Sequence, residues 1–293
     1  MTEVLRYAAD AISLGSLYAV FACGLALMLS VARIANFAYG DLMMVGSYAL
    51  LASGVLPWPA VIVLVLAAAI ALNVAIDRIA FRPIRRADGM TLLVVSVGIS
   101  VLIENVTRAV EGSRSKSVDF GGWFNSPVAL GGVSVPRLSI LTVIVAAALL
   151  GSLTLFLRRS LVGAQLRASS EDFAMSRLLG VRANKTIAIA FAISGAIAGV
   201  TAILLTMRSG SLSTDLGLQP TLVAFVAVVL GGMGSLTGAT LGGILLGVLS
   251  VILGAVLPDG LQPYRDAILF SLVIVILLGR PQGLFGAKAV ERV

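Results

Sequence analysis

The chain has 293 residues, of which 59% are hydrophobic and only 12% are charged, and its formal net charge is +7. A soluble globular domain averages about 45–50% apolar and about 25% charged residues, so this composition excludes a soluble enzyme with one terminal anchor. The basic residues lie in short loops between apolar runs and form no stripe that would bind nucleic acid. The composition therefore predicts a polytopic membrane protein.

Apolar runs follow one another along almost the whole chain. In order, they cover residues 11–30, 36–56, 60–76, 92–103, 138–157, 186–207, 218–230, 238–257 and 267–279. A helix needs about 20 residues to cross a bilayer, so these runs predict an all-α fold, a polytopic transmembrane helical bundle of about 8–9 spans with short or broken helices. Too little sequence remains for a separate folded unit, and we expect a single transmembrane domain over residues 1–293.

Two of these runs are too short to cross the hydrocarbon unaided. Residues 92–103 and 218–230 provide about a dozen residues each, whereas a span needs at least about 17. Either flanking residues extend these runs, or they are broken or re-entrant segments. Interrupted helices are tolerated only where they pack inside protein or line a cavity, and in transporters they often mark the substrate path.

Clusters of basic residues predict which loops are cytoplasmic. Two loops carry such clusters: Arg78, Arg82, Arg85 and Arg86 in the first, and Arg158, Arg159, Arg167, Arg177, Arg182 and Lys185 in the second. An even number of crossings separates the two loops, so both are predicted to be cytoplasmic, with residues 104–137 outside. If residues 218–230 span, four crossings follow the second loop and return the C-terminal tail to the same side. The N-terminus lies outside if residues 36–56 cross, and inside if they re-enter.

Several chemistries are excluded by the residues that the chain lacks. There is no histidine, which excludes imidazole metal sites and histidine-based catalytic triads. All three lysines lie outside the apolar runs, and Asp41 has no second acidic residue clearly at membrane depth with which to form an aspartyl protease site. We therefore expect no enzymatic activity, no metal site and no cofactor.

A glycine cluster over residues 231–238 lacks the lysine and the preceding strand of a phosphate-binding loop. One interpretation is close helix packing, because three nearby pairs have GxxxG spacing: Gly195 with Gly199, Gly238 with Gly242, and Gly243 with Gly247. The other is a broken helix that lines a path, because the cluster adjoins the short run 218–230. The residues leave both interpretations open.

Four stretches of the chain occur in the order and spacing of one known family. The first is Asn36-Phe37-Ala38-Tyr39-Gly40-Asp41 with Met44, Gly46, Ser47 and Tyr48; the second runs from Phe81-Arg82-Pro83-Ile84-Arg85 through Ser96, Gly98 and Ser100 to Glu104-Asn105 and Glu111-Gly112. The third comprises Arg167-Ala168, Glu171-Asp172, Leu178-Leu179-Gly180-Val181, Phe191, Gly195 and Gly199; the fourth is the glycine cluster with the tail Gly279-Arg280-Pro281-Gln282-Gly283-Leu284-Phe285-Gly286. Together they resemble the integral membrane permeases of the high-affinity branched-chain amino acid ABC transporters, the Liv type. Tyr39 and Asp41 replace the usual histidine and glutamate of that family.

The resemblance implies a permease subunit that forms half of a translocation pathway for branched-chain or related amino acids and performs no chemistry itself. It also implies the partners: a second related permease chain, two ABC ATPase subunits and an external solute-binding protein. The location it implies is the bacterial inner (plasma) membrane, where the chain is multi-pass and is surrounded by membrane lipid.

The leading candidates for the translocation path are Asn36, Tyr39 and Asp41, because polar groups inside a membrane are costly and usually functional. A carboxylate there could attract the ammonium group of an amino acid. The alternative is structural: Asn36 caps the second helix, and Asp41 lies in its first turn, stabilised by the helix dipole. Weaker candidates are Asn73, Ser96, Glu104, Asn105, Ser235 and Thr237.

A basic segment over residues 158–186 is predicted to be cytoplasmic, with a helix over residues 171–179 that Gly180 terminates. On composition alone it is a solvated loop between helices. In the family that this chain resembles, the segment inserts a short helix into a groove of the ATPase subunit. The coupling candidates carried over by the resemblance are Arg167, Glu171, Asp172, Ser176, Leu179 and Gly180, with Ser176 at a position where the family usually has alanine.

The substitutions at Tyr39 and Asp41 keep a second hypothesis open, namely the same architecture for another small solute such as urea, a short amide, ribose or a carboxylate. A different class, an ion-coupled transporter, is disfavoured because few acidic residues lie at membrane depth.

Overall fold

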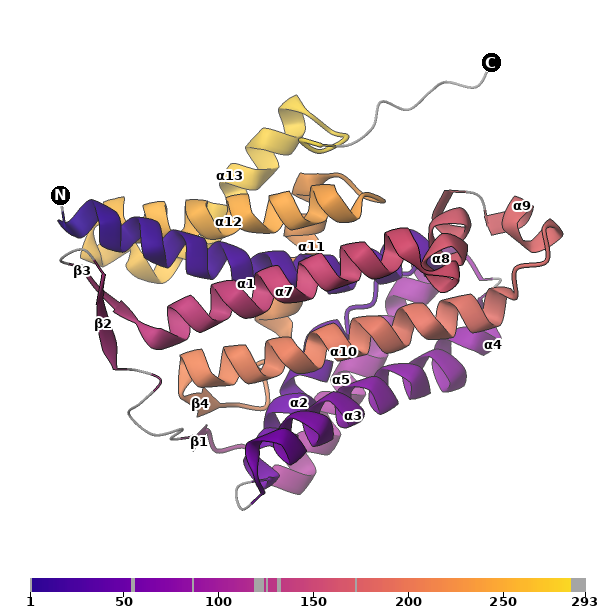
Figure 1. Cartoon of the computed structure of the whole chain (residues 1–293), viewed down its shortest axis with the longest axis horizontal. Helices are drawn as coiled ribbons and strands as arrows, with labels where there is room; N and C mark the ends of the chain where they lie inside the picture. The colour runs from indigo at the N-terminus through magenta and orange to yellow at the C-terminus, as the bar shows by residue number, and fades with distance from the viewer. Residues whose placement is uncertain are drawn as a thin grey trace. The chain divides into compact units, whose positions relative to one another are not determined.

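The computed structural model describes residues 2–53, 56–85, 87–118, 124, 126–130, 133–171 and 173–285. Helices dominate this part of the chain (Figure 1), and seven of those described are long and apolar enough to cross a membrane. The predicted all-α membrane fold is therefore confirmed. The long helices are α1 (Thr2–Ala32), α3 (Trp58–Ile76), α5 (Gly89–Glu111), α7 (Arg137–Arg159), α10 (Ala183–Ser209), α12 (Leu236–Val256) and α13 (Arg265–Gly279). Helix α13 reaches this length only together with the preceding η2, as a span of 21 residues over Asp259–Gly279.

Shorter elements connect these helices. They are α2 (Tyr39–Ala52), the π-helix η1 (Asp77–Phe81) and α4 (Arg82–Ile84) that continue α3, then α8 (Leu161–Glu171), α9 (Phe173–Leu178), α11 (Leu218–Gly231) and the 3₁₀-helix η2 (Asp259–Tyr264). Two antiparallel pairs of short strands join β1 (Lys116–Ser117) to β4 (Ser211–Leu212) and β2 (Pro127–Leu130) to β3 (Val133–Pro136).

The two short apolar runs behave differently. The run 92–103 is extended by its flanks into α5, which has 23 residues and can cross the bilayer. The run 218–230 becomes α11, which has only 14 residues. Helix α2 also has 14 residues, and at 1.5 Å per residue each spans about 21 Å, short of the hydrocarbon thickness of about 30 Å.

The order of elements occurs twice along the chain. A long helix, α1, is followed by a non-helical break, the 14-residue helix α2 and two long helical segments that end with α5. Likewise α10 is followed by a break, the 14-residue helix α11 and the two helices α12 and α13, while α7 stands between the two series. Unusually short helices at corresponding positions of two halves are a mark of transporters, where they flank the binding site.

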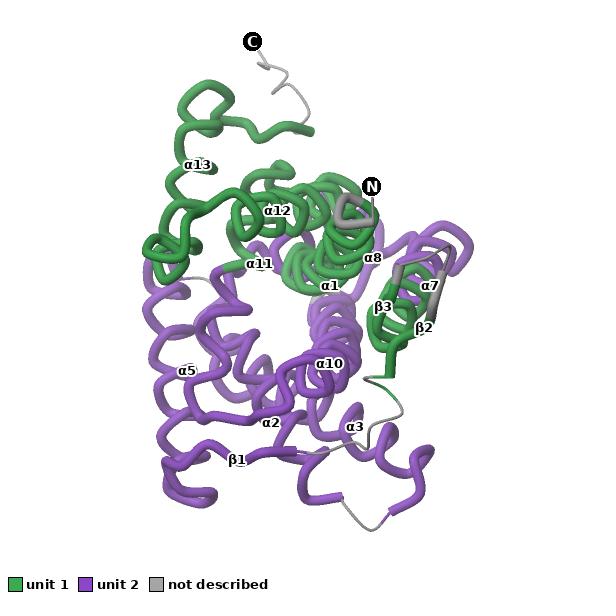
Figure 2. Tube along the Cα trace, turned by 90° about the vertical axis from the view of Figure 1, so that its left-hand side faces the viewer, with its two compact units in different colours: residues 1–26, 121–148, 223–293 green, residues 27–120, 149–222 purple. Residues whose placement is uncertain are grey.

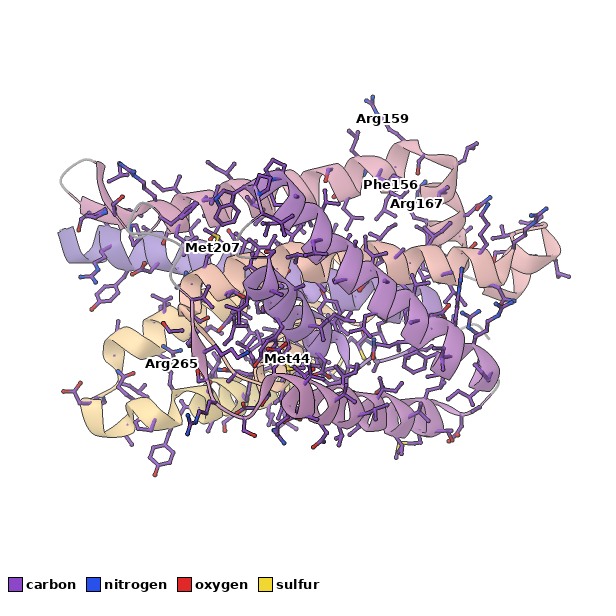
Figure 3. All side chains as sticks on the ribbon, turned by 90° about the horizontal axis from the view of Figure 1, so that it is seen from below. Met44, Phe156, Arg159, Arg167, Met207 and Arg265 are labelled. Atoms are coloured by element: carbon purple, nitrogen blue, oxygen red, sulfur yellow. The ribbon has the colours of Figure 1, made fainter. Side chains whose placement is uncertain are left out.

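The chain forms two compact units that interleave in sequence (Figure 2). Unit 2 comprises residues 27–120 and 149–222, and its densest packing joins α2, α3 and α10. Gly195 and Gly199 allow α10 to approach α3, because a Cβ at Gly195 would lie 2.9 Å from the carbonyl oxygen of Ala69. Gly46 allows α2 to approach α10 closely at Ala202. Figure 3 labels Met44 of α2 and Met207 of α10, both buried.

Unit 1 comprises residues 1–26, 121–148 and 223–293. Its helix α12 uses Gly243 and Gly247 to pack on α1, and Gly238 and Gly242 to pack on α11. A Cβ at Gly247 would lie 2.3 Å from the Cα of Gly15. The predicted close packing of these glycine pairs is thus confirmed. The tail also returns to this region, since the Leu284 amide donates to the Leu230 carbonyl at 2.8 Å.

The contacts at the two ends of α1 indicate the side on which the N-terminus lies. Arg33, directly after this helix, lines one pocket together with Arg82 and Lys185 of the basic loops. Arg6, near the start of the helix, lines another with the β2–β3 hairpin. With the basic loops on the cytoplasmic side, as predicted, the start of α1 lies outside. The crossing by residues 36–56 that this orientation requires stays a prediction, because α2 alone is too short to span the hydrocarbon.

Candidate functional site

The break between α1 and α2 is a tight, buried turn. Arg33 directly follows α1 and has a φ of 55°, in the left-handed region. The Asn36 side-chain oxygen accepts a hydrogen bond from the amide of Ala38 at 3.1 Å, and the Tyr39 amide donates to the Asn36 carbonyl at 3.2 Å. The N-cap residue of α2 is Ala38, and no side chain caps it. Asn36 therefore shapes the turn before α2, whereas Asp41 lies in the first turn of the helix.

The N-terminal ends of the two short helices meet inside unit 2. The Gly40 amide, in α2, donates to the Thr221 hydroxyl of α11 at 2.8 Å. A Cβ on Gly40 would lie 1.8 Å from the carbonyl oxygen of Gly217, and a Cβ on Gly217 would lie 2.3 Å from Oδ1 of Asp41. Only glycine fits at either position, because the backbones themselves are in contact.

Helix α5 lines this junction with polar side chains spaced four residues apart: Ser96, Ser100, Glu104 and Arg108. The Ser96 hydroxyl oxygen accepts from the Phe37 amide at 3.3 Å and so supports the break. Ser100 is a side-chain hydrogen-bond partner of the Asp41 carboxyl, and Glu104 is a charge that acts on it. Arg108 neutralises Glu104 through a 2.6 Å ion pair. The arrangement leaves Asp41 as the acidic group at the helix junction.

Two polar atoms at the junction are buried without a hydrogen-bond partner among the described residues. They are Nδ2 of Asn36 and Oδ2 of Asp41, and the residues that carry them are 0% and 3% exposed. Buried polar atoms are nearly always satisfied, by protein or by water. Atoms of this kind beside two helix N-termini are suited to a polar ligand or to water in a path. Tyr39 is fully buried next to them.

The remaining predicted path residues make other contacts. Asn105 is exposed on α5, and its amide donates to Val101 of the same helix at 2.7 Å. Asn73 joins α3 to α10 by donating to the Phe191 carbonyl at 2.7 Å. Ser235 is the N-cap of α12, and its hydroxyl accepts a hydrogen bond from the Gly238 amide. The Thr237 hydroxyl lies 3.1 Å from the Ser235 hydroxyl. Ser235 and Thr237 belong to unit 1.

The segment predicted to couple to a partner contains two short helices, α8 and α9. Gly180 follows α9 with a φ of 88°, and the Val181 amide donates to the Ser176 carbonyl at 3.1 Å. This is the Schellman arrangement that ends helices at glycine, so the predicted helix stop is confirmed. Ser176 is buried within 3.5 Å of Ser169, consistent with its small size. Asp172 lies outside the described residues.

Apolar side chains of this segment are exposed although it lies beyond the long spans. Leu178 and Leu179 are 82% and 78% exposed. Arg167 and Glu171 are exposed on α8, and Figure 3 shows Arg167 at the same end of the molecule as Arg159, the last residue of α7. Two adjacent exposed leucines outside the predicted spans are suited to contact with a partner.

A polar link joins the start of α10 to the π-helix. Arg85 donates to the Asp77 carboxylate, which is 1% exposed, and to the Asn184 side-chain oxygen at 2.6 Å. A π-bulge in an α-helix is often found at a functional site. The link thus connects the N-terminal end of α10 with the long helix formed by α3, η1 and α4.

Comparison with known proteins identifies the family. Residues 7–278 match the model of the family described as branched-chain amino acid transport system / permease component. The chain belongs to this family. It is also 34% identical to the high-affinity branched-chain amino acid transport system permease protein BraD of Pseudomonas aeruginosa, over the full length of both chains.

Two further relatives come from Escherichia coli K12. The chain is 33% identical to the permease protein LivH, over 97% of this chain and 96% of LivH, and 27% identical to LivM, over 96% of this chain and 70% of LivM. The family is one of transport permeases, so the predictions of a Liv-type permease and of no enzymatic role are confirmed. The chain is a multi-pass membrane protein.

Three residues of the junction were not among the predicted path residues. Ser100 could have been found from its four-residue spacing between Ser96 and Glu104, which places all three on one face of a helix. Gly217 and Thr221 gave no such signal, because they meet Gly40 only through the fold.

Proposed function

We propose that this permease forms half of the translocation pathway of an ABC importer for branched-chain or related amino acids. The observation that carries the proposal is the meeting of the α2 and α11 N-termini beside Asp41, with buried polar atoms left unpaired. A helix N-terminus carries partial positive charge and suits a carboxylate, whereas an aspartate suits an ammonium group. An α-amino acid has both groups, and urea, amides and sugars lack this pair of charges.

A second, related permease chain completes the pathway in this proposal. Similarity to both LivH and LivM supports it. Among the seven long helices described, α5 and the span that contains α13 are the least buried. In each, 11% of the apolar stretch is buried inside the chain. Asn105 is exposed within α5, and a polar side chain facing lipid is costly. A neighbouring chain or a water-lined path on that face removes this cost.

Energy comes from two ATPase subunits, and an external binding protein delivers the solute; the assembly lies in the bacterial inner membrane. We propose that the ATPases engage α8 and α9 through the exposed Leu178 and Leu179, together with Arg167, Glu171 and Asp172. In this proposal, a displacement of α9 is transmitted through the turn at Gly180 to α10 and, through the contact of Asn184 with Arg85, to the π-helix.

The test is uptake of labelled leucine in cells with and without the gene, with ATP depletion and collapse of the proton gradient as separate arms. We expect uptake to fall on deletion, to depend on ATP and to be insensitive to the gradient. Competition by unlabelled valine and isoleucine, but not by urea, short amides or ribose, would assign the solute class. Competition by urea or ribose alone would favour the second hypothesis, and dependence on the gradient would contradict an ABC importer.

A further inference from the structure

A large pocket opens at the cytoplasmic end of unit 2, where α1 ends, α5 begins and α10 begins. Its volume is about 1160 Å³. Five cationic side chains line it: Arg33, Arg82, Arg85, Arg182 and Lys185. No described residue that lines it is acidic. The role proposed above for α8 and α9 does not account for this concentration of positive charge.

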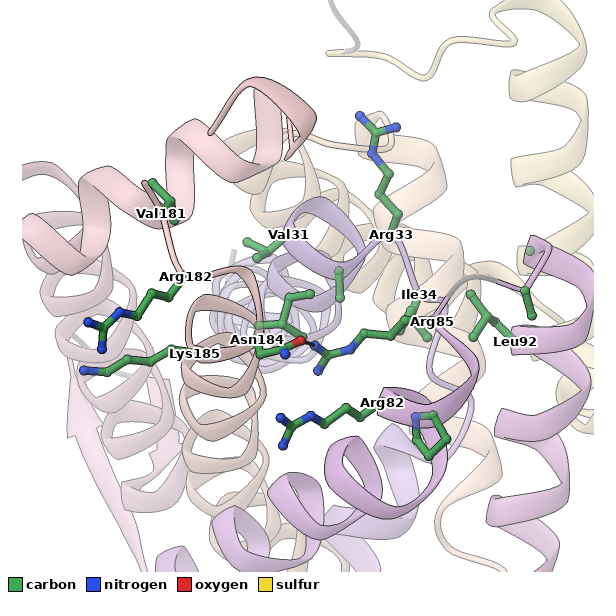
Figure 4. Close-up of a pocket in the computed structure, with 15 residues that line it drawn as sticks. Val31, Arg33, Ile34, Arg82, Arg85, Leu92, Val181, Arg182, Asn184 and Lys185 are labelled. Atoms are coloured by element: carbon green, nitrogen blue, oxygen red, sulfur yellow. Dashed lines mark hydrogen bonds between the residues drawn. The ribbon is translucent and has the colours of Figure 1, made fainter. Parts of the chain in front are cut away.

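Most of these cations have no anionic partner. Arg85 is held by Asp77 and Asn184, whereas Arg82, Arg182 and Lys185 form no ion pair with any described residue. In Figure 4 the side chains of these three extend in the same direction, and Arg33 points away from them. Like charges gathered around one opening repel one another, so an anion that enters it relieves the repulsion.

The pocket wall beneath these charges is apolar. Val31, Ile34, Leu92 and Ile187 line it, so the site combines a cationic rim with an apolar interior. The pocket also lies beside exposed apolar side chains at the start of α5: Leu92 and Gly89 belong to this helix, and the neighbouring Met90 and Val94 are 69% and 65% exposed. A ligand that matches this site has an anionic head and an apolar body, and it approaches from the membrane.

We propose that the pocket binds the phosphate headgroup of an anionic phospholipid of the cytoplasmic leaflet, with the adjoining part of the lipid against the apolar wall. Basic pockets between transmembrane helices on this side of a membrane are known to hold such headgroups. The lipid then contacts both the loop after α4 and the start of α10, the two segments that Arg85 and Asn184 also join. Anionic lipid therefore stabilises this end of the permease.

The test uses the purified full-length chain in phosphatidylcholine–detergent micelles, to which phosphatidylglycerol is added in steps while the melting temperature is recorded. We expect the melting temperature to rise to a plateau. In the triple variant R82Q/R182Q/K185Q, we expect the half-saturating fraction of phosphatidylglycerol to rise at least tenfold, since each cation near a lipid surface contributes about fivefold. Arg85 is left unchanged because its loss would strip Asp77 of its partner.

A matched control removes the same charge elsewhere on the cytoplasmic side. R78Q/R158Q/R159Q changes three exposed arginines that do not line the pocket, and it should retain the wild-type response. If both triple variants weaken the response to phosphatidylglycerol equally, the response reflects general surface charge, and the proposed binding site is wrong. An equal rise with inorganic phosphate in phosphatidylcholine micelles would overturn the lipid assignment. If R82Q/R182Q/K185Q does not fold, R182Q alone should shift the half-saturating fraction about fivefold.

Discussion

Replacing Gly40 by alanine tests whether the two short helices touch through their backbones. The added Cβ would lie 1.8 Å from the Gly217 carbonyl oxygen and 2.3 Å from the Thr221 hydroxyl. Real Cβ atoms essentially never approach other heavy atoms within 3.0 Å, so the helix ends must separate by at least 1.2 Å, the difference between 3.0 and 1.8 Å. A rigid backbone oxygen cannot move aside as a side chain does.

The expected cost follows from two contributions. Overpacking a buried contact costs about 1–3 kcal/mol, and here both partners are backbone, which places the cost at the upper end. Separation also breaks the hydrogen bond from Gly40 to Thr221, worth about 1 kcal/mol. A loss of about 3–4 kcal/mol should lower the melting temperature of a chain of this size by roughly 6–16 °C.

The assay is thermal unfolding of the purified protein in detergent, with Gly98→Ala as the matched control. Gly98 lies within α5 and has no atom within 4 Å of its Cβ position, so alanine there should be neutral or stabilising by up to about 1 kcal/mol. The two substitutions are chemically identical and are predicted to have opposite signs. A wild-type melting temperature for Gly40→Ala would refute the backbone contact. If that variant is not recovered, Thr221→Val, which removes the hydroxyl that accepts from the Gly40 amide and donates to the Gly217 carbonyl, should cost about 1–2 kcal/mol.

Three further predictions concern transport, coupling and stability. Asp41→Asn should reduce uptake while membrane insertion and melting remain close to wild type, because the shape is kept and the charge is lost; unchanged uptake would leave Asp41 a purely structural residue. Gly180→Ala should strain the end of α9 by about 1–2 kcal/mol and uncouple ATP hydrolysis from uptake. The control is Gly112→Ala, at a similar φ of 84° after α5, which should leave coupling intact. Equal effects of the two substitutions on coupling would contradict a coupling role for Gly180. Arg85→Gln should destabilise by about 3–5 kcal/mol because the buried Asp77 side chain loses its ion-pair partner. The double variant with Asp77→Asn should recover much of that loss, and additive losses would argue against the pair.

The helices themselves could be predicted from local sequence. Apolar periodicity and length gave α7, α10 and α12 to within a few residues, because lipid demands an unbroken apolar stretch. Helix α5 was predicted too short, since Glu104 and Arg108 are charged. The structure shows why the helix continues: these two residues pair at a four-residue spacing, so their charges are satisfied within it.

The candidate site was only half predictable. Asn36 and Asp41 stand out because polar residues at membrane depth are rare. Their partners Gly217 and Thr221 lie about 180 residues further along, and no local pattern links the two stretches. The repeated order of long and short helices was not predicted from a sequence motif common to the two halves. Each half needs only helices of the same lengths and a glycine where two backbones meet.

The length of α2 has a consequence for how the chain enters the membrane during synthesis. Its 14 residues are too few to be released into lipid as an independent span. The contacts that hold it, from Gly46 and Ser47 to Ala202 and Thr206 of α10, lie more than 150 residues later. At a synthesis rate of about 5–20 residues per second, α2 waits about 8–30 seconds for α10. During that interval, α2 must stay close to α1 and α3 or to the insertion machinery, so a delay in α10 should expose this segment to quality control.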